Sequence, residues 1–209
     1  MDTVVEFIGV NKSFSGRDIF QPELSFKIKR FDKFGISGKS GAGKSTALNL
    51  LMGFIQPDKG QVLLEGQKVT PQVVNNFRQK CVWIPQSFNF LKGLSVKQVI
   101  LTPFEYVVNI HNKPTEEKII AHLSKVKLDE RLLASEISEL SGGERQRVCA
   151  VIALLLEREI IILDEPTSNL DSEVSEDVIN IFLNSDKTII ISTHDKTIYD
   201  RCTNLVELV

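Results

Sequence analysis

The stretch Gly38-Lys39-Ser40-Gly41-Ala42-Gly43-Lys44-Ser45-Thr46 decides the fold of this chain. It fits the pattern of a glycine, four residues and Gly-Lys-Ser, which is typical of a loop that binds the phosphates of a nucleoside triphosphate. Its glycines let the backbone approach the phosphates and turn N–H groups toward them. We expect Lys44 to reach the β- and γ-phosphates and the Ser45 hydroxyl to ligate Mg²⁺. The alternative is a glycine-rich turn that binds nothing.

The bulk properties describe an ordinary globular protein. The chain has 209 residues, a net charge of -2, 42% hydrophobic and 25% charged residues, which suits one large domain or two small ones and gives no global reason to bind nucleic acid. Three widely spaced cysteines predict reduced thiols in a cytosolic protein. The longest apolar run, 148–156, is shorter than the roughly 18 residues that span a bilayer, and the first residues do not resemble a signal peptide.

The periodicity of apolar residues predicts an α/β fold. Strands are expected at 4–8, 24–28, 33–37, 81–84, 160–163 and 188–191, a hairpin at 61–69, and helices at 44–52, from 141 to about 156 and near 172–183. Strands that alternate with helices predict a parallel sheet covered on both faces. Apolar spacings of three and four between 95 and 134 predict a helical subdomain, inserted over about 87–140.

A second acidic motif follows an apolar strand at Ile160-Ile161-Ile162-Leu163-Asp164-Glu165-Pro166. We expect Asp164 to hold Mg²⁺, through its water shell, and Glu165 to polarise an attacking water. The alternative is a core strand followed by a solvated acidic turn. The phosphate-binding loop in the same chain favours the nucleotide site over this alternative.

Two further polar residues follow predicted strands. Gln86 comes after Trp83-Ile84-Pro85, where its amide is placed to ligate Mg²⁺ and to sense the γ-phosphate; most glutamines, however, are surface residues. His194 comes after the strand at 188–191, on the side of a parallel sheet where ligands bind, although a lone histidine is more often structural.

These elements, together with Leu140-Ser141-Gly142-Gly143-Glu144, resemble the nucleotide-binding domain of ATP-binding cassette (ABC) proteins over nearly the whole chain. The order is that of the family: phosphate-binding loop, glutamine, Leu-Ser-Gly-Gly-Glu signature, magnesium aspartate with adjacent glutamate, the D-loop Ser168-Asn169-Leu170-Asp171, and a histidine. The resemblance implies one cassette over 1–209. Its mixed sheet core and N-terminal antiparallel β-subdomain would occupy 1–86 and 141–209, and the helical signature subdomain about 87–140.

The resemblance also implies roles for single residues. Phe14 matches an aromatic that stacks on adenine, although a tyrosine is commoner there, and Gln86 links the site to the helical subdomain. Glu165 is the general base or positions the water, His194 contacts the γ-phosphate, and Asp171 makes a contact across a dimer. Residues 38–46 would contact the ATP bound by their own chain. The ATP bound by the partner subunit would be contacted by the signature residues Ser141, Gly142, Gly143 and Glu144.

A single cassette holds half of each nucleotide site, so the resemblance implies a head-to-tail dimer, with an identical or a different cassette, around two ATP molecules. Our leading hypothesis is the ATPase subunit of a membrane transporter, similar to the short subunits of bacterial export and lipoprotein-release systems. It would lie at the cytoplasmic face of the membrane, held by a separate transmembrane permease that docks near Gln86, the apolar residues of 88–91 and the early insert. A soluble ABC ATPase of DNA repair or translation is the alternative, and a P-loop kinase a third possibility that leaves the signature unexplained.

Overall fold

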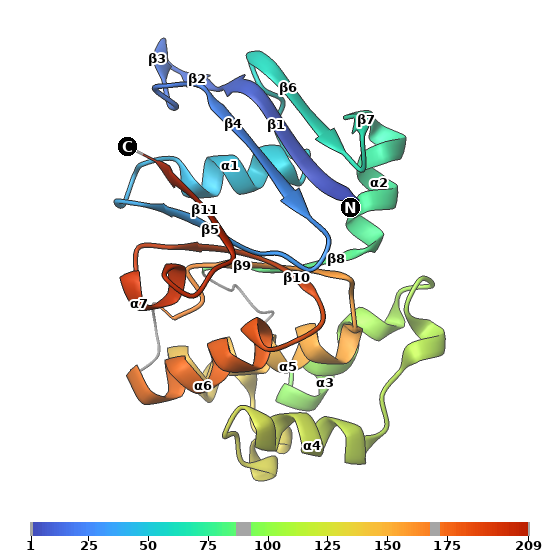
Figure 1. Cartoon of the computed structure of the whole chain (residues 1–209). Coiled ribbons are helices and arrows are strands. Elements are labelled where there is room, and N and C mark those ends of the chain that lie inside the picture. Colours follow the sequence, from blue (N-terminus) through green and yellow to red (C-terminus); the bar gives the residue numbers. More distant parts are fainter. Residues whose placement is uncertain (1, 87–92, 168–171, 209) are drawn as a thin grey trace.

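The structure is a computed structural model that describes residues 2–86, 93–167 and 172–208. Its centre is a five-stranded parallel sheet in the order β11-β5-β10-β9-β8 (Figure 1). The strands are β5 (Lys33–Gly38), β8 (Cys81–Ile84), β9 (Ile160–Asp164), β10 (Thr188–Thr193) and β11 (Asn204–Leu208). Every pair of neighbours in this sheet is parallel, so the carboxyl ends of all five strands lie along one edge.

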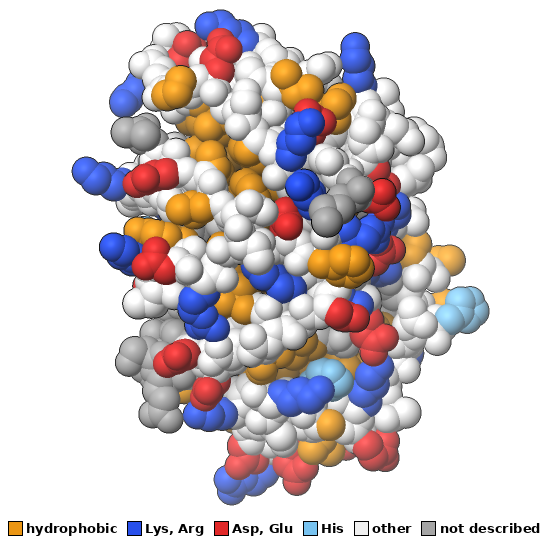
Figure 2. Space-filling view, in the orientation of Figure 1, with side chains coloured by type: hydrophobic (Ala, Val, Ile, Leu, Met, Phe, Trp, Pro, Cys, Tyr) orange, Lys and Arg blue, Asp and Glu red, His pale blue; other side chains and the backbone are white. Residues whose placement is uncertain are grey.

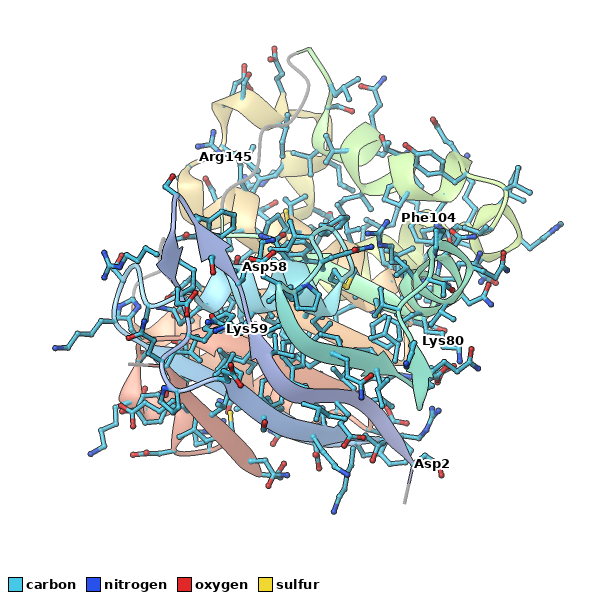
Figure 3. The ribbon with its side chains drawn as sticks, turned by 90° about the horizontal axis from the view of Figure 1, so that it is seen from above. Asp2, Asp58, Lys59, Lys80, Phe104 and Arg145 are labelled. Carbon is cyan, nitrogen blue, oxygen red and sulfur yellow. The ribbon has the colours of Figure 1, made fainter. Side chains whose placement is uncertain are left out.

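A second, antiparallel sheet is built from the N-terminal part of the chain. It has the order β4-β1-β6-β7, with β1 (Thr3–Asn11), β4 (Leu24–Lys29), β6 (Lys59–Leu64) and β7 (Gln67–Lys68). Seen from above, Asp2 and Lys80 lie at one end of this layer, and Asp58 and Lys59 lie toward the other (Figure 3). A small ribbon of β2 (Ser13–Phe14) and β3 (Arg17–Asp18) adjoins it.

Helices cover both faces of the parallel sheet. The helix α1 (Lys44–Leu51) lies between the two sheets, and α2 (Pro71–Gln79) follows the β6–β7 hairpin (Figure 1). On the other face lie α3 (Val96–Leu101), α4 (Glu116–Lys125), α5 (Gly142–Leu156) and α6 (Ser172–Leu183), with the short α7 (Lys196–Tyr199) near the C-terminus. Between β8 and α5 the chain also forms short 3-10 helices, at Thr102–Glu105, Ile110–Asn112, Glu130–Ala134 and Ile137–Glu139.

The central strands are buried on both faces because successive side chains point to opposite sides of a sheet. Ile161 and Leu163 of β9 join a core with α3, α5 and α6, whereas Ile160 and Ile162 join a second core with α1 and the antiparallel sheet. This explains why β9 reads as an uninterrupted apolar run. The parallel sheet is therefore held from both sides, which fixes the edge that carries the polar residues.

The predicted α/β class, the parallel sheet and the antiparallel N-terminal layer are confirmed. The helix α2 and the strand β11 were not predicted. The start of α2 carries a recognisable signal, since Thr70 caps it and Pro71 is its first residue, but only Val74 and Phe77 are buried along it. β11 is an edge strand with one buried residue, Leu208, so its apolar alternation is weak. No helix within the described ranges is long and apolar enough to cross a membrane.

Candidate nucleotide-binding site

The polar residues singled out in the sequence gather where the parallel strands end. Gly38 ends β5, Asp164 ends β9 and Thr193 ends β10. The register places Ser192 beside Asp164 and Thr193 beside Ser37, so the three strand ends are level with one another. Ligands bind at this edge in open α/β sheets. The residues that follow these strands therefore meet, although Ser37 and Thr193, paired at this edge, are 156 positions apart in the sequence.

The loop between β5 and α1 has a backbone that glycines alone adopt easily. Gly41 and Gly43 have φ values of 83° and 98°, in the left-handed region. A Cβ on Gly43 would lie 2.6 Å from a methyl carbon of Ile19 and 2.9 Å from the ring of Phe20. Gly43 is also the N-cap of α1, and no side chain caps that helix. Free N–H groups at a helix start favour an anion.

Lys44 points back into this loop. Its Nζ donates hydrogen bonds to the backbone carbonyls of Gly38 at 2.8 Å and Lys39 at 3.2 Å. The same Nζ lies 3.1 Å from Oε1 of Glu165. Only 7% of the residue is exposed. The ammonium group is thus held at the centre of the loop, where it faces any group that the loop N–H groups surround.

Asp164 and Ser45 bring two oxygen ligands together. The Ser45 hydroxyl donates to Oδ2 of Asp164 at 3.3 Å, and the Ser192 hydroxyl donates to Oδ1. Burial raises the pKa of the Asp164 carboxyl, against the effect of these hydrogen bonds. Sequence analysis missed Ser192, because its role depends on the pairing of β10 with β9, which no local pattern reveals.

Glu165 lies between the lysine and the histidine. Its backbone has a φ of 47°, which is uncommon for a residue other than glycine, and its N–H donates to the Ser192 carbonyl at 3.0 Å. Its carboxylate has Lys44 on Oε1 and Nδ1 of His194 on Oε2, at 2.9 Å. Glu165 is buried, whereas the His194 side chain is 67% exposed. A buried base therefore touches a histidine that can reach a ligand from the outside.

Two predicted site residues are not brought into this cluster. Gln86 is exposed and follows β8 at the same edge of the sheet, but among the described residues its side chain forms no hydrogen bond to Ser45 or Asp164. Phe14, in β2, is 48% exposed, and the Lys12 ammonium lies 5.8 Å from the centre of its ring. Its ring is therefore available for stacking. Among the described residues, no hydrogen bond or ring contact between Phe14 and the loop at 38–46 supports the predicted role. Asp171 and the whole D-loop, as well as the apolar residues of 88–91, lie outside the described residues.

The signature residues form a separate helix start. Ser141 is the N-cap of α5; its hydroxyl accepts from the Glu144 N–H at 3.2 Å, and Glu144 in turn accepts from the Ser141 N–H at 2.8 Å. The hydrogen bonds from Ser141 lower the pKa of the Glu144 carboxyl. Ser141 and Gly142 are exposed, and no hydrogen bond between described residues joins this turn to the loop before α1. The turn thus offers N–H groups to solvent.

The oxygen donors suit a magnesium ion. Mg²⁺ prefers carboxylate, hydroxyl and water oxygens and keeps part of its water shell. The Ser45 hydroxyl and the Asp164 carboxylate lie side by side, next to the loop that is shaped for phosphates. In the described part of the chain, no group of three or more His, Cys, Asp or Glu side chains is arranged so that it could hold a metal ion. The ion would therefore be bound mainly by water and phosphate oxygens, as expected for a metal that enters with a nucleotide.

Comparisons with known proteins agree with this geometry. Residues 22–168 match the model of the ABC transporter family. The chain is 34% identical over 206 residues to the lipoprotein-releasing system ATP-binding protein LolD of Buchnera aphidicola, covering 93% of this chain and 90% of LolD. It superimposes on the dimeric structure of MJ0796, a bacterial ABC transporter cassette, with a TM-score of 0.82 and 25% identity over 98% of this chain and 94% of that one. A post-hydrolysis dimer of MJ0796 bound to ADP and Pi gives a TM-score of 0.81, at 25% identity and the same coverage. The chain therefore belongs to the ABC transporter family, as an ATP-binding and ATP-hydrolysing cassette.

Proposed function

We propose that this chain is the ATPase subunit of a transporter, that it pairs head to tail with a second cassette on ATP, and that it powers a separate membrane-spanning permease. The observation that carries the proposal is the cluster of Lys44, Glu165 and His194 at the start of α1, beside the Ser45–Asp164 pair. One cluster supplies a cation for phosphates, a buried base and oxygen ligands for a metal. The similarity to LolD supports the transport role and does not favour DNA repair or translation.

In this proposal each residue has a defined task. Residues 38–46 surround the phosphates with N–H groups, and Lys44 contacts the β- and γ-phosphates. Ser45, Asp164 and Gln86 would hold Mg²⁺, which when bound would neutralise charge on the phosphate oxygens. Glu165 accepts the proton of the attacking water or orients it, and His194 contacts the γ-phosphate. Phe14 stacks on adenine.

The second half of each site comes from the partner. Within the Ser141–Glu144 turn, the N–H groups of Gly142 and Gly143 donate to no described residue, and they lie at the start of a 15-residue helix, which favours an anion. Because no hydrogen bond between described residues joins this turn to the loop before α1, we place it against the γ-phosphate bound by the other cassette. Asp171 is proposed as a further contact across that dimer. The structural similarity to an MJ0796 dimer supports this arrangement.

The permease is proposed to dock where the helical insert, about 87–140, meets the core formed by 1–86 and 141–209. An irregular stretch of the insert exposes half or more of each of its apolar side chains: Tyr106, Val107, Val108 and Ile110. Hydrophobic side chains lie at the edge of the molecule where this stretch runs (Figure 2). Asn109 anchors it, since Arg158 donates to its side-chain oxygen and its amide donates to the Pro103 carbonyl at 2.8 Å.

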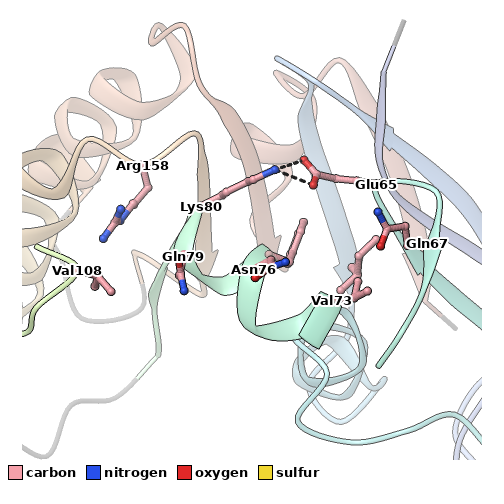
Figure 4. Close-up of a pocket in the computed structure, with 10 residues that line it drawn as sticks. Glu65, Gln67, Val73, Asn76, Gln79, Lys80, Val108 and Arg158 are labelled. Atoms are coloured by element: carbon pink, nitrogen blue, oxygen red, sulfur yellow. Dashed lines mark hydrogen bonds and ion pairs between the residues drawn. The ribbon is translucent and has the colours of Figure 1, made fainter. Parts of the chain in front are cut away.

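A pocket of about 460 Å³ adjoins this apolar stretch, between α2, the β6–β7 hairpin and Val108 (Figure 4). Its charged lining includes Arg158 and an ion pair between Lys80 and Glu65 with distances of 2.7 and 2.8 Å. Lys80 and Arg158 precede β8 and β9, so the pocket lies at the opposite end of the strands from the nucleotide residues. It is therefore open to a protein partner while ATP is bound, and the permease would hold the chain at the cytoplasmic face of the membrane.

The proposal is tested by capture from detergent-solubilised membranes. The wild-type chain is expected to retain a membrane-spanning protein that raises its ATPase rate after reconstitution, and Val108→Asp is expected to lose that partner while it keeps its basal ATPase rate. Glu130→Gln, an exposed change elsewhere in the insert, is the control. Stimulation by DNA or ribosomes, without a membrane partner, would favour the soluble alternative instead.

A further inference from the structure

Gln146 is a buried polar residue of α5 that none of the assigned roles uses. It lies five residues after Ser141, and 4% of its surface is exposed. Its side-chain nitrogen donates to the backbone carbonyl of Glu165 across 3.4 Å. Its side-chain oxygen, also buried, accepts no hydrogen bond from any described residue. The helix that begins with the signature is therefore bonded directly to the peptide of the proposed catalytic glutamate.

The stability of the core does not explain a glutamine at this position. An unpaired buried amide oxygen costs free energy, whereas a methionine or leucine of similar volume would fill the space without that cost. The neighbouring buried residues of the same helix, Val148, Cys149, Ala150 and Val151, are apolar or weakly polar. What the glutamine adds is one directed hydrogen bond to Glu165.

That hydrogen bond completes the support of the Glu165 peptide. From β10, Ser192 accepts the Glu165 N–H with its carbonyl at 3.0 Å and its hydroxyl at 3.2 Å. From α5, Gln146 donates to the Glu165 carbonyl. Glu165, between these two hydrogen-bonding partners, has a φ of 47°, a conformation that L-residues adopt only when their surroundings hold it. The direction of the Glu165 carboxylate therefore depends on the sheet and on the signature helix together.

We propose that Gln146 is a positioning residue for ATP hydrolysis, which links the signature helix to Glu165 of the same chain. The inference rests on the proposed function, in which the signature turn meets the nucleotide of the partner while Glu165 acts on the nucleotide of its own chain. A shift of α5 when its turn meets the partner's γ-phosphate then moves the Gln146 amide, and with it the Glu165 peptide. Each nucleotide site thereby senses whether the other one is closed.

The first test replaces the amide without changing the volume. Gln146→Met is expected to lower kcat about 10-fold, which corresponds to about 1.4 kcal/mol in the barrier, while the Kd for ATP changes less than twofold. Its melting temperature should change by no more than a few degrees, because loss of the hydrogen bond to the Glu165 carbonyl opposes the gain from removing an unpaired buried oxygen. Gln146→Glu, which keeps the shape but cannot donate when ionised, should lose at least as much activity. Ile152→Met, six residues further along the same helix and partly buried against the apolar core, is the control and should leave kcat unchanged.

A double-mutant comparison shows whether Gln146 acts through Glu165. In a Glu165→Gln background, measured in single-turnover experiments, Gln146→Met is expected to cause no further loss, because the group that it positions is already disabled. An equal loss in both backgrounds, an unchanged kcat of Gln146→Met, or a loss of ATP affinity that matches the loss of kcat would each overturn the inference. Failure of the proposed function looks different: the wild-type chain itself would show no hydrolysis that depends on Glu165.

Discussion

The ammonium group of Lys44 lies 3.1 Å from a carboxylate oxygen of Glu165, and less than a tenth of either side chain is exposed. A buried pair of this kind is stable only while both partners are present, because removal of one leaves a charge without compensation. In the proposed reaction the phosphates of ATP attract the same ammonium group. Binding of ATP would therefore withdraw the cation from Glu165 and leave its carboxylate with His194, where it can act on water.

Replacing Lys44 is expected to affect both ligand binding and folding. Lys44→Met should weaken ATP binding at least 10-fold, through lost phosphate contacts, and lower the free energy of unfolding by about 3 kcal/mol, because Glu165 stays buried without its cation. Calorimetric titration and urea denaturation measure the two effects. In the double variant Lys44→Met/Glu165→Gln most of the stability should return while ATP binding stays weak. An unchanged affinity of Lys44→Met would remove the phosphate-binding role of the loop.

Glu165→Gln is expected to separate binding from hydrolysis. The amide keeps the size of the side chain but cannot accept a proton, so turnover should fall at least 100-fold while ATP still binds. The nucleotide should then trap a dimer, visible by size-exclusion chromatography with Mg²⁺ and ATP. Glu157→Gln makes the same chemical change in an exposed pair with Lys118 and should behave as the wild type. Near-normal turnover of Glu165→Gln would contradict its role, and a strictly monomeric protein would contradict the dimer.

Removing the exposed histidine is expected to change catalysis with little effect on the fold. The His194 side chain is 67% exposed, and its contact in the site is the hydrogen bond to Glu165. His194→Ala should therefore lower kcat at least 10-fold and shift the melting temperature by no more than a few degrees. Steady-state kinetics and thermal melting check the two parts. A large fall in stability with unchanged kcat would show that the histidine is structural.

Local patterns predicted most of what positions the site. The residues of the loop at 38–46 and the Asp164–Glu165 pair each follow a buried apolar strand, and a parallel sheet brings the ends of such strands to one edge. The features that the sequence did not predict depend on contacts between segments that are distant in the chain. Ser192 supports Asp164 only because β10 pairs with β9. Gln146 reaches Glu165 only because α5 shares an apolar core with β9. Neither relationship leaves a trace in the neighbouring sequence.

The loop glycines were predicted as a class, but their individual importance comes from the structure. Gly41 and Gly43 both have a positive φ, yet nothing lies within 4 Å of a Cβ on Gly41, whereas a Cβ on Gly43 would meet Ile19 and Phe20. Gly41→Ala should therefore cost about 1 kcal/mol, from the backbone alone, and Gly43→Ala about 3 kcal/mol, from the backbone and the clash together. Urea denaturation measures both. Equal losses would show that Ile19 and Phe20 move aside without cost.

The raised pKa of Asp164 predicts how stability depends on pH. Burial is the main cause, so the folded state holds the proton of Asp164 at pH values where the unfolded chain, with an ordinary pKa of about 3.9, has released it. Folded molecules then bind more protons, and stability falls as pH rises through the interval between the two pKa values. Asp164→Asn cannot ionise and escapes this loss. Its stability relative to the wild type should therefore be greater at pH 7 than at pH 4, in urea denaturation, while its Mg²⁺-dependent ATPase activity is abolished.

Asp129 provides the control with the opposite sign. Hydrogen bonds from Arg131 lower the pKa of its carboxyl to about 2, so its ionised form favours the folded state. That contribution is present above the ordinary pKa and disappears as pH falls through about 2, the folded value. Asp129→Asn should therefore be slightly less stable than the wild type at pH 7, by a small amount because the pair is exposed, with full ATPase activity. If Asp164→Asn instead followed the same trend as Asp129→Asn, the hydrogen bonds from Ser45 and Ser192 would outweigh burial, and the ionised carboxylate of Asp164 would favour the folded state.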